Sequence, residues 1–233
     1  MSRGTLSRWI LGFAFLSLGF SVQASDIIIG EPALIATGNC DPFGCPEFFG
    51  LGTYQQVYAG SPSFSGESTI AGITFYNDQV QNGATPAGGT FTLSLSYTSK
   101  TPGDLDLSNP TNNISPGTSQ VFFSGTLPFL SQNTLDFVGT PFIYNPAVGD
   151  LLLTITVTDP SDHALTLFLD QASSTTQTTD AFYGTFTGGN NSGGLVTGFT
   201  FASSIATPEP GSLLFMLGGA GLIACRWRRR RFV

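Results

Sequence analysis

From about residue 50 onward, apolar and polar side chains alternate along much of the chain. In Thr90–Tyr97 (TFTLSLSY) and Leu151–Thr158 (LLLTITVT), every second residue is a large apolar one. Side chains of a strand point alternately to its two faces, so this spacing predicts half-buried β-strands. No helical periodicity occurs between residues 26 and 206. The middle of the chain is therefore expected to be all-β.

Shorter apolar runs, separated by clusters of Gly, Pro, Asn, Asp and Ser, predict further strands. They are Tyr54–Tyr58, Ile70–Tyr76, Val121–Ser124, Leu135–Val138, Phe142–Tyr144, Ala164–Asp170, Phe182–Thr187 and Thr197–Ala202. The Ser/Thr-rich Ala172–Asp180 is expected to be a long loop, because strand patterns continue on both sides of it. This pattern predicts a single β-sandwich or jelly-roll-like ectodomain over residues 25–206.

Charge is distributed unevenly along the chain. Of the 233 residues, 8 are Lys or Arg and 15 are Asp or Glu, but Lys100 is the only Lys or Arg between residues 10 and 225. A surface so short of cations should repel nucleic acid and anionic lipid head groups. No nucleic-acid partner is expected.

The first 24 residues have the form of a secretory signal. Arg3 and Arg8 precede the apolar run Trp9–Phe20, and Val22-Gln23-Ala24 is a small-x-small sequence. These features predict a signal helix that signal peptidase cleaves after Ala24. A permanent anchor is the less favoured alternative, because the run is shorter than the ~20 residues of a spanning helix.

Two cysteines bracket a short turn-forming sequence in CDPFGC, and export determines how they are interpreted. In an oxidising compartment, Cys40 and Cys45 are expected to form a disulfide. Zinc is the alternative, but a structural zinc site needs about four ligands and the chain has one histidine, His163. No metal ligands are assigned.

The sequence offers little for catalysis. His163 lies among turn-forming residues, and no nucleophile-elbow, zinc-protease or phosphate-loop motif occurs. The closest acid pairs, Asp104 with Asp106 and Asp159 with Asp162, could serve a glycosidase only if a cleft held them. They are expected to be solvated charge, and no catalytic residue is assigned.

Three patterns suggest ligands without establishing one. The segment DLDLSNP begins like a calcium loop but lacks its glycine and its bidentate glutamate, so calcium is conceivable in loops but no motif supports it. The aromatics Phe48, Phe49, Tyr54 and Tyr58 could stack on sugars, although core packing is favoured. Thr154, Thr156 and Thr158 share a strand face, but one strand is too narrow a surface to order ice.

The C-terminus combines a short apolar stretch with a cluster of arginines. Ser212–Cys225 is uncharged, and as a helix its 14 residues would measure about 21 Å against a hydrocarbon core of ~30 Å. Interfacial Trp227 and snorkelling arginines would lengthen the span. The expected transmembrane residues include Leu213, Leu214, Phe215, Met216, Leu217, Leu222 and Ile223, and the basic stop is Arg226, Arg228, Arg229, Arg230 and Arg231. The arginines would keep this end in the cytoplasm.

Pro208, Glu209 and Pro210, followed by this apolar stretch and the arginines, closely resemble the PEP-CTERM sorting signal of Gram-negative bacteria. The resemblance covers residues 207–233 and implies recognition of the three residues by exosortase, a membrane transpeptidase-like enzyme. Exosortase would remove the tail and pass the body to the cell surface or the exopolysaccharide matrix. Gly211 departs mildly from the pattern, in which Ser or Thr often follows.

The body resembles an ectodomain that recurs in PEP-CTERM proteins, through GLGTYQQVYAGSPSF, GTPFIYNPAVGDLLLTITVT and GGLVTGF. That resemblance implies one domain and carries no established activity. The expected function is therefore that of a non-enzymatic exported protein, held transiently in the inner membrane by its tail helix. The alternative is a carbohydrate-binding module that recognises exopolysaccharide.

Overall fold

The computed structural model describes residues 26–32, 38–44, 52–78, 87–131, 133–161, 167–172, 177–183 and 193–202. The signal segment and the sorting tail lie outside these residues, and the described residues belong to one compact unit, Ala24–Ala202. The strands are β1 (Ile27–Ile29), β2 (Thr53–Tyr58), β3 (Ser68–Tyr76), β4 (Gly88–Thr98), β5 (Gln120–Gly125), β6 (Thr134–Tyr144), β7 (Asp150–Ser161), β8 (Thr178–Tyr183) and β9 (Thr197–Phe201).

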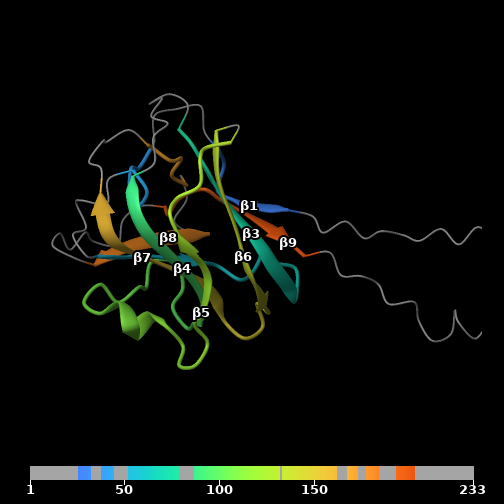
Figure 1. Ribbon diagram of the computed structural model, residues 1–233. Coiled ribbons are helices and arrows are strands. Elements are labelled where there is room, and N and C mark those ends of the chain that lie inside the picture. Colours follow the sequence, from blue (N-terminus) through green and yellow to red (C-terminus); the bar gives the residue numbers. More distant parts are fainter. Residues whose placement is uncertain are drawn as a thin grey trace, which may run out of the picture. The chain divides into compact units, whose positions relative to one another are not determined.

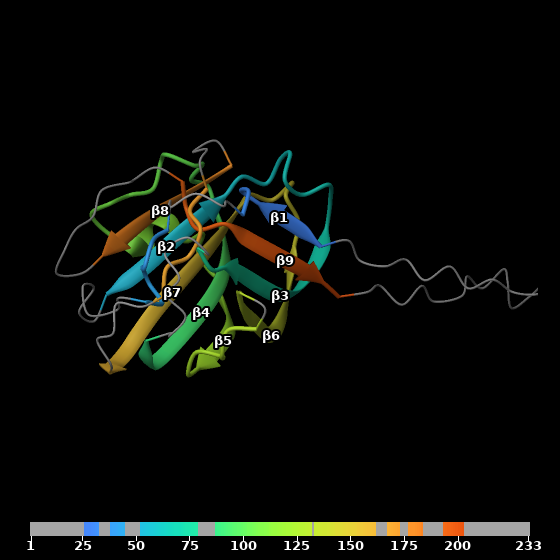
Figure 2. The same cartoon turned by 90° about the horizontal axis from the view of Figure 1, so that it is seen from above.

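The strands form two antiparallel sheets (Figures 1 and 2). One sheet has the order β1-β9-β3-β6, and the other has the order β5-β4-β7-β2-β8. Within the described ranges the one helical element is a short 3₁₀ helix, η2 (Pro110–Asn113). The prediction of an all-β fold is thus confirmed for this part of the chain.

Period-two patterning explains the register of the five-stranded sheet. β7 lies at its centre, where Ile155 is opposite Leu93 of β4 and Tyr54 of β2. These three side chains are buried on the same face of the sheet. The alternate position Thr154 is half-buried on the other face, as expected for a strand whose side chains alternate in direction.

Aromatic rings connect the two sheets in one hydrophobic core. Phe43, from the turn after Cys40, lies 5.0 Å from Phe75 of β3 and 5.8 Å from Phe91 of β4, measured between ring centroids. Tyr58 of β2 meets Phe199 of β9 edge to face at 5.0 Å. Such contacts add to the stabilisation from burial of the rings.

A second, smaller cluster covers the opposite face of the five-stranded sheet. It consists of the buried residues Val57, Leu105, Leu152, Ala181 and Tyr183. Leu105 belongs to the segment that leads into η2, so this segment packs on the sheet and explains why Leu152 is apolar at an outward-facing position.

Some predicted strand boundaries were wrong. Leu135–Val138 and Phe142–Tyr144 are parts of one strand, β6, which continues through Pro141. Proline is tolerated there because β6 is at the edge of its sheet and need not donate on both sides. The short strand β1 has no counterpart among the predicted strands.

Two further predictions fail around β8. The segment Ala172–Asp180 is not entirely loop, because β8 begins at Thr178, four residues before the predicted strand Phe182–Thr187. The sequence pattern did not predict the first residues of β8, because Thr178, Thr179 and Asp180 show no alternation of apolar and polar side chains. The described part of Ala164–Asp170 forms isolated bridges through Leu169 rather than a strand.

In the part of the chain that the structure describes, no helix has the length and apolar character needed to cross a membrane.

Candidate functional site

The aromatic side chains considered for sugar stacking are core residues wherever the structure describes them. Tyr54 and Tyr58 of β2 are 1% and 0% exposed. The favoured prediction of core packing is confirmed for both residues, and the sugar-stacking alternative is wrong for them. Phe48 and Phe49 lie outside the described residues.

A buried polar network surrounds Gln56 of β2. Its side-chain amide Nε2 donates to the carbonyl of Leu195 at 2.8 Å and to Thr178 Oγ1 at 3.0 Å. Its Oε1 accepts from the amide of Leu195 at 2.9 Å and from the Tyr54 hydroxyl. The Gln56 side chain thus both donates to and accepts from the backbone of Leu195, as a paired residue of a neighbouring strand would. These two bonds link β2 to the segment before β9. A buried amide that is satisfied in this way stabilises one register.

The charges of two acids, Asp180 and Asp41, act on Tyr54 of this network and add to the rise in its pKa that burial causes. Asp180 of β8 is opposite Gln56 in the register, and its side chain is 0% exposed. Asp41 follows Cys40, and its backbone amide donates to Asn39 Oδ1 at 3.0 Å. Burial raises the pKa of Asp41 to about 7. Burial also raises the pKa of Asp180 to about 7, with a further contribution from the charge of Asp41, while the Tyr54 hydroxyl offsets part of the rise.

Three carboxylate oxygens of these two acids are buried: Asp41 Oδ1 and both oxygens of Asp180. The backbone amide of Asp180 and the Tyr54 hydroxyl act as donors to the Asp180 carboxylate and lower its pKa, but burial has the larger effect. The neighbouring Tyr54 hydroxyl is directed at Gln56 Oε1. Burial of these oxygens explains why both acids keep their protons to a higher pH than usual.

Asp104 and Asp106, which the sequence analysis considered as a pair, are each hydrogen-bonded to side chains of their own loop. Asp106 accepts hydrogen bonds from the amide and hydroxyl of Ser108 at 2.9 and 2.6 Å and from Asn112 Nδ2 at 2.7 Å. These bonds, led by that from the Ser108 hydroxyl, hold its pKa below the usual range. Asp104 accepts from Thr101 Oγ1 at 2.9 Å. The calcium-loop-like segment is therefore a turn that is closed on the Asp106 carboxylate.

The remaining predicted residues are described in part. Asp159 lies in β7 with a φ of 51°, whereas Asp162 and His163 lie outside the described residues. Cys40 is disulfide-bonded. Cys45 also lies outside, so its pairing with Cys40 stays a prediction.

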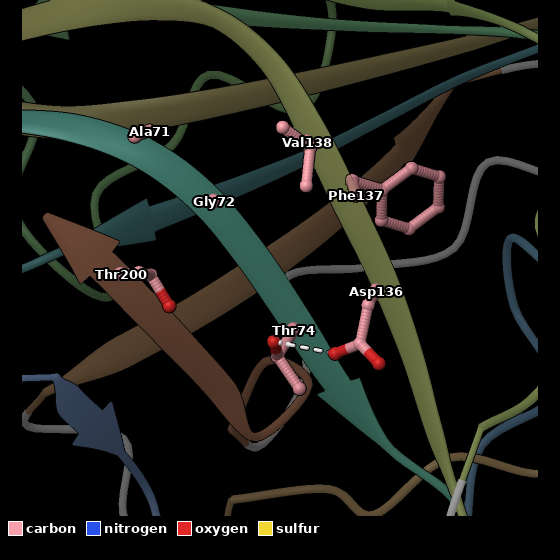
Figure 3. A pocket seen from close by; sticks show the side chains of 7 residues that line it. All are labelled: Ala71, Gly72, Thr74, Asp136, Phe137, Val138 and Thr200. Atoms are coloured by element: carbon pink, nitrogen blue, oxygen red, sulfur yellow. Dashed lines mark hydrogen bonds between the residues drawn. The ribbon is translucent and has the colours of Figure 1, made fainter. Parts of the chain in front are cut away.

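An open hollow of about 350 Å³ lies on the outer face of the four-stranded sheet (Figure 3). It is lined by Ala71, Gly72, Thr74, Asp136, Phe137, Val138 and Thr200, from strands β3, β6 and β9. In Figure 3 the side chains of Thr74 and Asp136 point toward each other, and the Thr74 hydroxyl donates to Asp136 Oδ1 at 2.7 Å. The hollow thus combines a carboxylate, hydroxyl groups and an exposed apolar wall at Val138. Sequence analysis missed it, because its residues come from three strands.

Hydroxyl side chains also spread across the outer face of the five-stranded sheet. Thr156 is opposite Thr53 of β2 and Thr92 of β4, and Thr92 Oγ1 lies 3.1 Å from Ser124 Oγ. The argument that this array is one strand wide was therefore wrong. Pairing between strands distant in the sequence widens it.

Comparison with family models, with curated proteins and with solved structures finds no match for this chain in any of the three.

Proposed function

We propose that this chain is a non-enzymatic exported protein, sorted by exosortase to the cell surface or the exopolysaccharide matrix of a Gram-negative bacterium. The observation that carries the proposal is the order of three features in the tail: Pro208–Pro210, the uncharged stretch Ser212–Cys225, and the terminal arginines. The disulfide at Cys40 supports export, because disulfides persist mainly in oxidising compartments.

In this proposal the two sheets form a β-sandwich ectodomain, flanked by a signal helix and a C-terminal transmembrane helix. The rings of Phe43, Tyr58 and Phe199 support the sandwich, since they connect the sheets through a shared core.

Changing Pro208, Glu209 and Pro210 together to alanine is expected to block processing without blocking export. Leu213–Cys225 and the arginines are unchanged, so the variant should still insert into the inner membrane through its apolar stretch. Full-length protein should accumulate there, while the wild type loses an epitope placed after Val233. Immunoblots of membrane and surface fractions measure both outcomes.

Alanine at Thr207, Gly211 and Ser212 provides the matched control, and it should be processed like the wild type. Wild-type protein should also remain uncut in a host without exosortase. Identical processing of the PEP variant and the wild type would contradict the sorting proposal and leave the tail as a membrane anchor.

The second candidate function is that of a carbohydrate-binding module, and the hollow on the four-stranded sheet favours it. Carboxylate and hydroxyl groups beside an apolar surface are the groups that orient a sugar in a binding site. Asp136 is held in place by Thr74 and by Thr134, whose hydroxyl donates to it at 2.8 Å. A polysaccharide could lie along this open face.

Asp136→Ala is expected to weaken binding to an exopolysaccharide fragment at least tenfold, because it removes the carboxylate and leaves the Thr74 hydroxyl without its acceptor. The measurement is a glycan array followed by calorimetry on any sugar that binds. Asp104→Ala, which changes an exposed acid in a loop outside this hollow, should bind like the wild type. Silence of the wild-type protein on all glycans would exclude this second function and leave the first unaffected.

A further inference from the structure

One tyrosine of β3 lies on the outer face of the four-stranded sheet, beside the hollow. Tyr76 is two residues after Thr74, and side chains of a strand alternate in direction, so both project from the same face. Tyr76 is half-buried, whereas Tyr54 and Tyr58 are fully buried in the core. Part of the Tyr76 ring is therefore accessible to a ligand.

Gly198 of β9 leaves room for this ring to lie across the sheet. Gly198 is opposite Thr74 in the register. A Cβ atom at Gly198 would lie 2.8 Å from the Tyr76 hydroxyl oxygen, 3.6 Å from Tyr76 Cε2 and 3.4 Å from Thr74 Cβ. The end of the ring thus occupies the space that a side chain at Gly198 would fill, and it lies next to Thr74.

Thr74 connects the ring to an oriented carboxylate. Its hydroxyl donates to Asp136 Oδ1 at 2.7 Å (Figure 3), and the Thr134 hydroxyl donates to Asp136 Oδ2 at 2.8 Å. These two bonds fix the direction of the carboxylate, which is exposed. Each carboxylate oxygen can accept more than one hydrogen bond, so both retain capacity for a donor on a ligand.

Negative charge on this face has no cation of the protein near it. Lys100 is the sole Lys or Arg of the described ranges, and it follows β4, a strand of the other sheet. Burial raises the pKa of Tyr76, and the charges of Asp136 and then Asp26 add to this rise. The face should therefore attract a cationic group and repel an anionic one.

An aromatic ring beside a carboxylate is suited to bind an ammonium group. The carboxylate can accept a charge-assisted hydrogen bond from it, and the face of the ring attracts the same positive charge. The apolar wall at Val138, which is 82% exposed, and the exposed hydroxyl of Thr200 suit the carbon skeleton and the hydroxyl groups of a sugar. A sugar chain that carries free amines combines all of these groups.

We propose that the face formed by Tyr76, Asp136 and Val138 binds an amine-bearing polysaccharide, such as a glucosamine polymer. Asp136 pairs with the protonated amine of one sugar unit, and Tyr76 stacks on the apolar face of a neighbouring unit. This inference rests on the second candidate function, the carbohydrate-binding module, and names its substrate class.

The test compares two sugar chains of equal length and linkage, an oligomer of glucosamine and one of N-acetylglucosamine. Calorimetry on the full-length protein is done at about pH 5.5, where the free amines are protonated, and at about 0.15 M salt, which screens non-specific attraction between exposed charges. The glucosamine oligomer should bind at least tenfold more tightly, because acetylation removes the positive charge.

Tyr76→Ala and Asp136→Asn are each expected to weaken binding of the glucosamine oligomer at least tenfold. Asp104→Asn is the matched control, since it removes the same charge from an exposed loop outside the hollow and should bind like the wild type. The Tm of each variant shows directly whether it is folded.

Gly198→Ala tests the placement of the ring without removing any group that contacts the sugar. Its Cβ would displace the end of the Tyr76 side chain, so binding should fall at least fivefold. Its Tm should not fall, because the atom that must move is the end of a flexible side chain and because glycine weakens a strand interior.

Equal affinity for the two oligomers would overturn this inference and leave the carbohydrate-binding module in place. Binding of the glucosamine oligomer that is unchanged in both Tyr76→Ala and Asp136→Asn would also overturn it. Absence of binding to any sugar would overturn both the inference and the second candidate function. The sorting proposal is tested by processing of the tail, so its failure is a separate result.

Discussion

Tyr58→Ala is expected to destabilise the protein by about 3–5 kcal/mol, the usual cost of removing a large buried aromatic side chain. The ring is 0% exposed and meets Phe199 of the other sheet edge to face. Its hydroxyl lies 2.9 Å from Thr197 Oγ1. The substitution removes this contact between sheets and leaves a cavity. Urea denaturation followed by circular dichroism measures the loss in free energy of unfolding.

Tyr58→Phe is the control, since it keeps the ring and removes only the hydroxyl. Its cost should be about 1 kcal/mol, because Thr197 Oγ1 still donates to the Leu195 carbonyl at 2.8 Å. A cost below about 1 kcal/mol for Tyr58→Ala would contradict the placement of this ring in the core. Loss of sugar binding in Tyr58→Ala would report unfolding and not a lost sugar contact.

The free energy of unfolding is expected to fall as the pH rises from about 5 to about 8. Asp41 and Asp180 have a pKa of about 7 in the folded protein against an ordinary 3.8. Between these values the folded state binds more protons than the unfolded state, so raising the pH favours unfolding. Each raised pKa contributes a loss of about 2 kcal/mol over this range.

Chemical denaturation at a series of pH values measures this slope. Asp180→Asn cannot titrate at that position, so its stability should depend less steeply on pH, whereas Asp136→Asn should behave like the wild type. A wild-type stability that increases steadily from about pH 5 to about pH 8 would contradict the raised pKa values.

Local patterns in the sequence were sufficient to identify most of the strands. Thr90–Tyr97 and Leu151–Thr158 lie within β4 and β7, because alternation needs no knowledge of distant partners. The sequence was less informative where a segment becomes a strand through hydrogen bonding to a neighbouring strand and its own side chains do not alternate between apolar and polar. Thr178–Asp180 is strand because β2 lies beside it, with Gln56 opposite Asp180, and nothing in the local pattern indicates that neighbour.

The candidate sites depended on the tertiary structure. Asp41 lies in CDPFGC and Asp180 in the Ser/Thr-rich segment, and neither local sequence indicates that its carboxyl group has a raised pKa. The hollow around Asp136 likewise joins three strands that are separated along the chain.

The sequence by itself therefore determined the class of fold, through period-two alternation, and it carries the export and sorting hypothesis, because such signals are read as linear segments. Only the tertiary structure decided that Tyr54 and Tyr58 are core residues, and that burial raises the pKa of Asp180. The physical reason is that burial and electrostatic coupling depend on which distant residues become neighbours. Strand pairing and sheet packing determine those neighbours, and composition and local spacing do not.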